Sequence, residues 1–261
     1  MLFGRPLFFS AVLVVIINLV SAASLWATPR WVRLSFEGDP STTMSVTWND
    51  DSQAVLFVQW GLTPSYGNET TSKVVAMGGD LEYVHSARMD GLTPDTVYHY
   101  RVGNTDKWSP DYTFATAPAG KCDPIKIQIF GDSRAQIGAG SAMRYQDLLM
   151  SGFSLGPDLM INTGDIVHKG EEAPQWSEDL AKETTVATFI PLLNIIGNHD
   201  DGPGEGDEAN FNKLFTYPRN PVNDMEDFYS FDYGNAHFAV LSPYTFKSDG
   251  TFQMQAEWLD K

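Results

Sequence analysis

The spacing of apolar residues changes in character about halfway along the chain. In residues 28–118, short apolar runs such as Met44–Trp48 alternate between apolar and polar side chains with a period of two. Val55–Trp60 and Val97–Val102 are further runs of this kind, and turns rich in Gly, Pro and Asp separate them. Several short strands at such intervals are typical of a β-sandwich. We therefore predict an all-β N-terminal domain over residues 28–118.

The second half, residues 124–261, has a different pattern in which apolar strand-like runs alternate with helical ones. A segment rich in small residues and proline, Thr116–Pro124, joins the halves as a domain linker would. The expected strands are 125–129, Leu159–Asn162 and Pro191–Ile196, the expected helices are Ala142–Met150 and Pro174–Thr188, a hairpin spans Tyr229–Tyr244, and a last helix begins near residue 252. Alternating strands and helices predict an α/β domain with a parallel sheet that is covered on both faces.

Three polar loops follow the three strands of this predicted sheet. They carry Asp132, Asp165 and Asn198, each 33 residues after the one before. That interval accommodates a strand, a crossover helix and the next strand, a unit of roughly 30 residues or more. Parallel strands joined in this way end at the same edge of the sheet, where α/β proteins place their binding sites. We therefore expect the three loops to converge.

Metal binding is the chemistry that these loop residues favour. The oxygens of two aspartates and an asparagine suit hard or borderline dications, and a histidine adds a nitrogen ligand for zinc, iron or manganese. Asp165, in the middle loop, is the natural bridge between two ions, with Asp132 on the first and Asn198 on the second. Either Gly-Asp pair alone is more often a simple turn. The three loops in this order and spacing favour a site over coincidence.

Two residues beside Asn198 are candidates for proton chemistry. His199 is placed to bond a substrate oxygen or to protonate a leaving group. Asp200 is expected to orient the imidazole ring of His199 through its other nitrogen.

The N-terminal 23 residues differ from everything that follows. Arg5 precedes the apolar stretch Leu7–Val20, and Ser21-Ala22-Ala23 supplies the small residues of a cleavage site. This arrangement is typical of a secretory signal peptide, with a retained membrane anchor as the alternative. We expect residues 1–23 to be removed and the protein to be secreted or periplasmic, without stable insertion in a membrane.

Charge and cysteine content narrow the range of partners. The chain has 33 acidic and 17 basic residues, for a net charge of −16, and a surface of this sign repels nucleic acids and anionic membranes. No nucleic-acid partner is expected, and an anionic small substrate requires a local source of positive charge such as bound dications. The single cysteine, Cys122, is expected to be a free thiol.

The loop motifs resemble those of a known superfamily. GDSR at 131–134, GDIVH at 164–168 and GNHD at 197–200 look like the first three motifs of calcineurin-like metallophosphoesterases. Leu92–Tyr98 (LTPDTVY) resembles the tyrosine corner of fibronectin type III domains, and YSFDYGNAHFAVL from Tyr229 resembles the purple acid phosphatase branch. The resemblance implies a fibronectin III-like sandwich followed by an α/β metallophosphoesterase domain.

An activity is also implied by this resemblance. It is the hydrolysis of phosphate monoesters of small molecules by a hydroxide that bridges two metal ions, one iron and a second iron, zinc or manganese. The resemblance leaves the substrate's identity and the oligomeric state open.

Three departures from the family pattern change the expectations for individual residues. His168 stands where purple acid phosphatases have a tyrosine ligand, so it is either a replacement ligand or a solvated loop histidine. Arg134 replaces a histidine of the first motif, and an arginine can pair with a phosphate oxygen but cannot ligate a metal while charged. No histidine follows His237, although the family has three more ligands downstream. We therefore expect a truncated enzyme, with a degenerate, non-catalytic secreted binding protein as the alternative.

Overall fold

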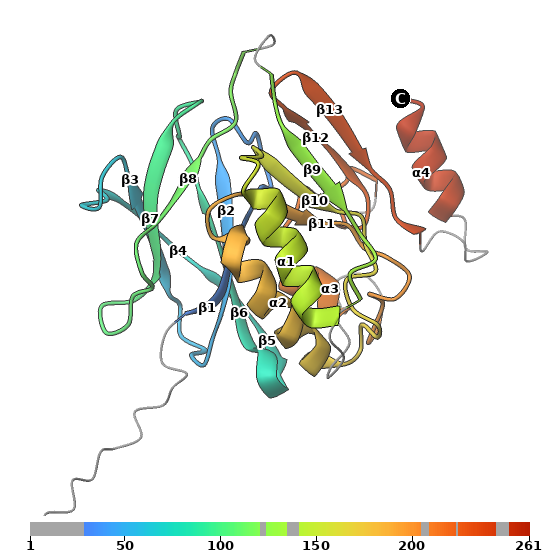
Figure 1. The fold of residues 1–261 in the computed structure, drawn as a ribbon, viewed down its shortest axis with the longest axis horizontal. Coiled ribbons are helices and arrows are strands. Elements are labelled where there is room, and N and C mark those ends of the chain that lie inside the picture. The colour runs from blue at the N-terminus through green and yellow to red at the C-terminus, as the bar shows by residue number, and fades with distance from the viewer. Residues whose placement is uncertain (1–28, 121–123, 135–140, 205–208, 223, 244–250) are drawn as a thin grey trace, which may run out of the picture.

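The structure is a computed structural model that describes residues 29–120, 124–134, 141–204, 209–222, 224–243 and 251–261 (Figure 1). The predicted signal peptide, residues 1–23, and Cys122 lie outside these ranges. Within them, no helix has the length and apolar character needed to cross a membrane.

The N-terminal half is a sandwich of two four-stranded antiparallel sheets, as the alternating pattern predicts. One sheet has the order β1-β2-β6-β5 and the other β4-β3-β7-β8. The strands are β1 (Arg30–Ser35), β2 (Met44–Asp50), β3 (Phe57–Gly61), β4 (Asn68–Thr71), β5 (Lys73–Gly78), β6 (Glu82–Met89), β7 (Val97–Gly103) and β8 (Tyr112–Ala115), with a 3-10 turn at Gly79–Leu81. Trp48, Val58 and Tyr100 are fully buried between the sheets.

The expected tyrosine corner is present at the start of β7. The ring of Tyr98 is buried, and its hydroxyl oxygen accepts a hydrogen bond of 2.9 Å from the backbone N–H of Thr93. This bond closes the loop before the strand, because it supplies a partner for an N–H group that no strand pairs.

The second half has a parallel three-stranded sheet of order β11-β10-β9 at its centre. Its elements are β9 (Ile127–Phe130), α1 (Ser141–Phe153), β10 (Leu159–Asn162), α2 (Ala173–Ala187), β11 (Leu192–Asn194), α3 (Asn210–Leu214), the antiparallel pair β12 (Tyr229–Tyr233) and β13 (Ala236–Val240), and α4 (Thr251–Leu259). The predicted strands, crossover helices, hairpin and last helix are all confirmed.

The two crossover helices cover one face of this sheet. Helices α1 and α2 pack against each other on one face, next to the sandwich (Figure 1). The chain visits β9, β10 and β11 in spatial order, so two right-handed crossovers place their helices on the same side. Helix α4 lies beyond β12 and β13, away from α1 and α2.

The two halves share one hydrophobic core and several buried hydrogen bonds. The hydroxyl of Tyr100 donates to the carbonyl of Thr188 at the end of α2, at 2.8 Å. Ser35 of β1 donates to the carbonyl of Thr216, also at 2.8 Å, and the buried guanidinium of Arg33 donates to the carbonyl of Leu214. The sandwich therefore supports the helix that lies beneath the polar loops.

Replacing Tyr98 with Phe tests the tyrosine corner. The variant keeps the buried ring but leaves the N–H of Thr93 without its acceptor, so we expect the free energy of unfolding to fall by about 1 kcal/mol. Chemical denaturation measures the change. Tyr83→Phe on β6 is the control, since its hydroxyl has no hydrogen-bond partner among the described residues; an equal loss in both variants would contradict a specific role for the corner.

Candidate metal centre

The three predicted loops converge at the carboxyl edge of the parallel sheet. Asp132 after β9, Asp165 after β10 and Asn198 after β11 all line one pocket of about 580 Å³. The pocket wall also contains apolar residues, among them Ile196 from the loop after β11 and Phe252 from α4. The expectation from the regular spacing of 33 residues is therefore confirmed.

Backbone hydrogen bonds join the first two loops. The N–H of Asp132 donates to the carbonyl of Gly164, and the N–H of Arg134 donates to the carbonyl of Asp165, both at 2.9 Å. Asp132 and Asp165 share an unusual left-handed conformation, with φ of 55° and 54°. Non-glycine residues adopt this region at a conformational cost and do so preferentially at functional sites. The two aspartates are thus held in matching turns.

Close packing against Asp165 explains the glycine before Asn198. A Cβ atom on Gly197 would lie 2.2 Å from the backbone nitrogen of Asp165 and 2.4 Å from its Oδ1. Only glycine allows the second and third loops to approach this closely.

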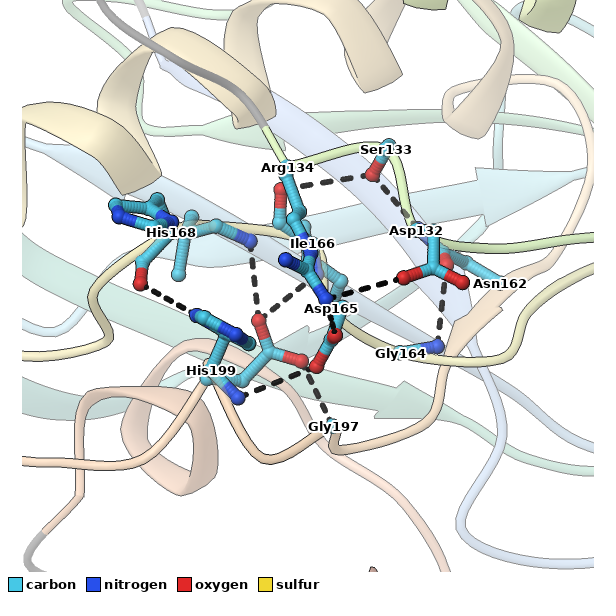
Figure 2. A network of polar contacts seen from close by, with 12 residues as sticks. Asp132, Ser133, Arg134, Asn162, Gly164, Asp165, Ile166, His168, Gly197 and His199 are labelled. Atoms are coloured by element: carbon cyan, nitrogen blue, oxygen red, sulfur yellow. Dashed lines mark hydrogen bonds and ion pairs between the residues drawn. The ribbon is translucent and has the colours of Figure 1, made fainter.

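The guanidinium of Arg134 bridges the two aspartates (Figure 2). Its Nη2 atom is 2.6 Å from Oδ2 of Asp165 and 3.3 Å from Oδ1 of Asp132. The side chain of Asp165 is only 12% exposed, whereas that of Asp132 is 79% exposed. Both carboxylates therefore lie within ion-pair distance of the same nitrogen atom, whose positive charge reduces their mutual repulsion.

His168 and His199 form a second part of the site. Their rings stack with centroids 5.2 Å apart (Figure 2). Nδ1 of His199 lies 2.9 Å from the carbonyl oxygen of His168, so Nδ1 carries the hydrogen and Nε2 is the nitrogen left for other chemistry. The backbone N–H of His199 also donates to Oδ1 of Asp165, at 3.2 Å. The backbone of His199 in the third loop therefore contacts the candidate metal donor Asp165 in the second loop.

The expected role of Asp200 as the orienter of the His199 ring is wrong. The carboxylate is fully buried and accepts from the N–H groups of Ile166 and Val167, at 2.9 and 3.0 Å, and of Gly197, at 2.7 Å. The carbonyl of His168 orients the ring instead. Burial raises the pKa of Asp200 to about 7, although the hydrogen bonds from the three N–H groups lower it. Two of these N–H groups belong to the second loop and one to the third, so the carboxylate of Asp200 joins the two loops.

A buried polar cluster beneath the loops is not predicted from the sequence. It consists of Tyr145, Asn162, Glu183 and Asn194. The available signal is that Leu159–Asn162 and Leu192–Asn194 are apolar strands that each end in an asparagine, directly before a donor loop. Buried amides of this kind require partners, which only the helices can provide.

The three loops bring together oxygen donors of the kind that a hard cation binds. Asp132, Asp165 and Asn198 offer oxygen atoms to one pocket, as such a cation requires. Among the residues that the structure describes, no three His, Cys, Asp or Glu side chains cluster closely enough to enclose an ion. The described residues therefore supply only part of the ligand set of a metal ion.

Fold and site together define a two-domain protein in which a fibronectin-like sandwich precedes a metallophosphoesterase domain. The sequence matches the family models of the purple acid phosphatase N-terminal domain over residues 29–116 and of the calcineurin-like phosphoesterases over residues 125–259. The chain thus belongs to the calcineurin-like phosphoesterase family, in its purple acid phosphatase branch. Members of this family use binuclear metal centres and act on phosphorylated substrates.

Individual relatives match most of the length of this chain. The chain is 25% identical to probable inactive purple acid phosphatase 27 of Arabidopsis thaliana, over 87% of this chain and 44% of the relative. It is 23% identical to purple acid phosphatase 13 of the same plant, over 72% of this chain and 41% of the relative. It therefore spans less than half the length of these curated relatives.

A solved structure supports the fold assignment. The purple acid phosphatase PPD1 from yellow lupin seeds superposes with a TM-score of 0.69 at 22% identity, over 87% of this chain and 48% of that one.

Replacing Asp200 with Asn tests its role in joining the loops. An amide has one acceptor oxygen and directs an NH₂ group at one of the three N–H donors, so we expect a loss of about 2 kcal/mol in the free energy of unfolding. Denaturant unfolding at pH 8 measures it. Asp201→Asn is the control for charge and position, and an equally small effect of both substitutions would refute the role.

Proposed function

We propose that the chain serves as an exported, metal-dependent phosphoesterase that hydrolyses phosphate monoesters of small molecules. The observation that carries the proposal is that Asp132, Asp165 and Asn198, from three separate loops, line one pocket. Family membership supports the phosphoesterase class. The signal-like pattern of residues 1–23 supports export.

Asp132, Asp165 and Asn198 would hold the metal. When bound, a dication of this kind supplies Lewis acidity and lowers the pKa of its coordinated water. Its charge also reverses the local sign of an acidic protein, which an anionic substrate requires. His168, whose ring stacks on His199, stays a predicted additional ligand.

Arg134 and His199 would act on the substrate. With a metal held by these residues, the guanidinium would no longer be needed to neutralise the aspartates and would be free to pair with phosphoryl oxygens. Nε2 of His199 is the ring nitrogen available to transfer a proton to the leaving oxygen, since Nδ1 is engaged by the carbonyl of His168. Asp200 contributes by holding the loops rather than by touching substrate.

A non-catalytic, phosphate-binding role is the second candidate. It is favoured by the ion pairs of Arg134, which already neutralise both carboxylates without a metal. In that case the guanidinium remains in place and offers its remaining N–H groups to an anion. The name of the Arabidopsis relative, a probable inactive phosphatase, is consistent with such a role.

Metal binding by an Asp165→Asn variant tests the first candidate. The substitution removes one carboxylate from the donor set, so we expect the affinity for Mn²⁺ or Zn²⁺ to fall by at least about tenfold. Isothermal titration calorimetry measures the dissociation constants. Asp147→Asn, an exposed aspartate on α1, is the control for net charge.

Hydrolysis of a chromogenic phosphate monoester by the metal-loaded chain is measured alongside. If the unsubstituted chain binds neither ion at millimolar concentration and releases no chromophore, the phosphoesterase assignment fails. Phosphate binding without metal then supports the second candidate.

An Arg134→Gln variant separates the two candidates further. Removing the competing positive charge should tighten dication binding by roughly tenfold or less, the range for one surface-accessible ion pair. It should also weaken binding of inorganic phosphate, because the charged donor is lost. Unchanged metal affinity in calorimetric titrations would show that the guanidinium does not compete for the metal position.

A further inference from the structure

The strongest unassigned feature is the buried carboxylate of Glu183 on α2, only 1% exposed beneath the donor loops. Both of its oxygens are engaged. Oε1 accepts from the hydroxyl of Tyr145 on α1, and Oε2 accepts from Nδ2 of Asn194, each at 2.9 Å. A charged group in this position is costly to bury unless its acceptor sites are filled in this way.

One arm of this network leads to the second donor loop. Nδ2 of Asn162, the last residue of β10, lies 3.4 Å from the hydroxyl of Tyr145. Oδ1 of Asn162 accepts from the backbone N–H of Gly164, at 3.2 Å. Gly164 immediately precedes Asp165, so the amide of Asn162 holds the turn that presents this aspartate.

The other arm leads toward the third loop. Asn194 is the last residue of β11 and pairs in register with Asn162 of β10. Its backbone N–H donates to the hydroxyl of Tyr217, at 2.8 Å. Glu183 thus holds the ends of two neighbouring strands just before their donor loops.

All hydrogen bonds of the first arm run in one direction. Gly164 donates to Asn162, Asn162 to Tyr145, and Tyr145 to Glu183. If Glu183 did not accept the tyrosine hydrogen, the hydroxyl could donate to Asn162, whose amide would then turn its oxygen away from Gly164. Glu183, the acceptor at the end of this series of hydrogen bonds, therefore sets the orientation of the Asn162 amide beside the second loop.

We propose that Glu183 is a positioning residue of the candidate metal centre, which aligns the loops of Asp165 and Asn198 through Tyr145, Asn162 and Asn194. Its functional meaning rests on the proposed phosphoesterase activity, but its effect on the loops is a property of the metal-free chain. Asp179, one turn earlier on α2, is fully buried, and burial raises the pKa of its carboxyl well above the usual range. Burial also raises the pKa of the Glu183 carboxyl, while the hydrogen bonds from Asn194 and Tyr145 lower it.

Hydrogen exchange of the metal-free full chain tests the proposal, with peptides followed by mass spectrometry. In Glu183→Ala we expect exchange in segments 163–168 and 195–199 to accelerate about tenfold, the change expected when a buried hydrogen bond of typical net strength is lost. Strand β2 of the sandwich should be unaffected. Glu178→Ala is the matched control on the same helix, since Glu178 pairs only with Lys182 among the described residues.

Two further variants separate positioning from general support of the fold. Glu183→Gln should restore slow exchange, because its oxygen still accepts from Tyr145 and its amide can donate to Oδ1 of Asn194, which has no donor among the described residues. Tyr145→Phe should loosen segment 163–168 and leave 195–199 unchanged, since it breaks one arm only. Tyr145→Phe also tests the proposal if the Glu183→Ala variant does not fold.

The outcomes are distinct. Uniform acceleration across the chain, failure of Glu183→Gln to restore protection, or loosening of both loops by Tyr145→Phe would each overturn the proposal. Calorimetric titration with Mn²⁺ adds a second readout, in which Glu183→Ala should bind about tenfold more weakly and Glu183→Gln nearly as well as the original chain. If the original chain binds no Mn²⁺ while the exchange pattern holds, the proposed function fails and the positioning role stands.

Discussion

The candidate site depends on one buried carboxylate, that of Asp200. Its two oxygens accept three backbone hydrogen bonds from segments that no strand pairs, at Ile166, Val167 and Gly197. Unpaired N–H groups at this depth would cost about 1–3 kcal/mol each. Because one side chain satisfies all three, the second and third loops keep a fixed relation, and Asp165 is presented in a constrained turn.

The candidate site needs a local positive charge because it lies on an acidic protein and contains two carboxylates. Asp132 and Asp165 meet at the sheet edge of a protein with a net charge of −16, and Arg134 bridges them. A phosphate ester can approach only if that local sign is reversed, which a dication does more strongly than one guanidinium. In the two functions proposed for the chain, either a metal or the guanidinium of Arg134 would supply that charge.

The sandwich is a structural part of this arrangement. Tyr100 donates to the end of α2, and Arg33 is buried at the same interface. Helix α2 carries Glu183, whose carboxylate holds the strand ends under the donor loops. Packing in the N-terminal domain thus reaches the candidate metal centre through α2, with a shared hydrophobic core between the two halves.

Periodicity and spacing by themselves determined the two-domain organisation, the order of strands and helices, and the convergence of Asp132, Asp165 and Asn198, because these follow from local pattern and the geometry of parallel strands. Helix placement on one face depended on strand order, which local pattern does not encode. Only the tertiary structure decided that Asp200 binds backbone rather than a histidine ring, and that Glu183 lies beneath the loops. Both depend on which polar groups folding leaves buried without a partner, and that is a property of the packed chain.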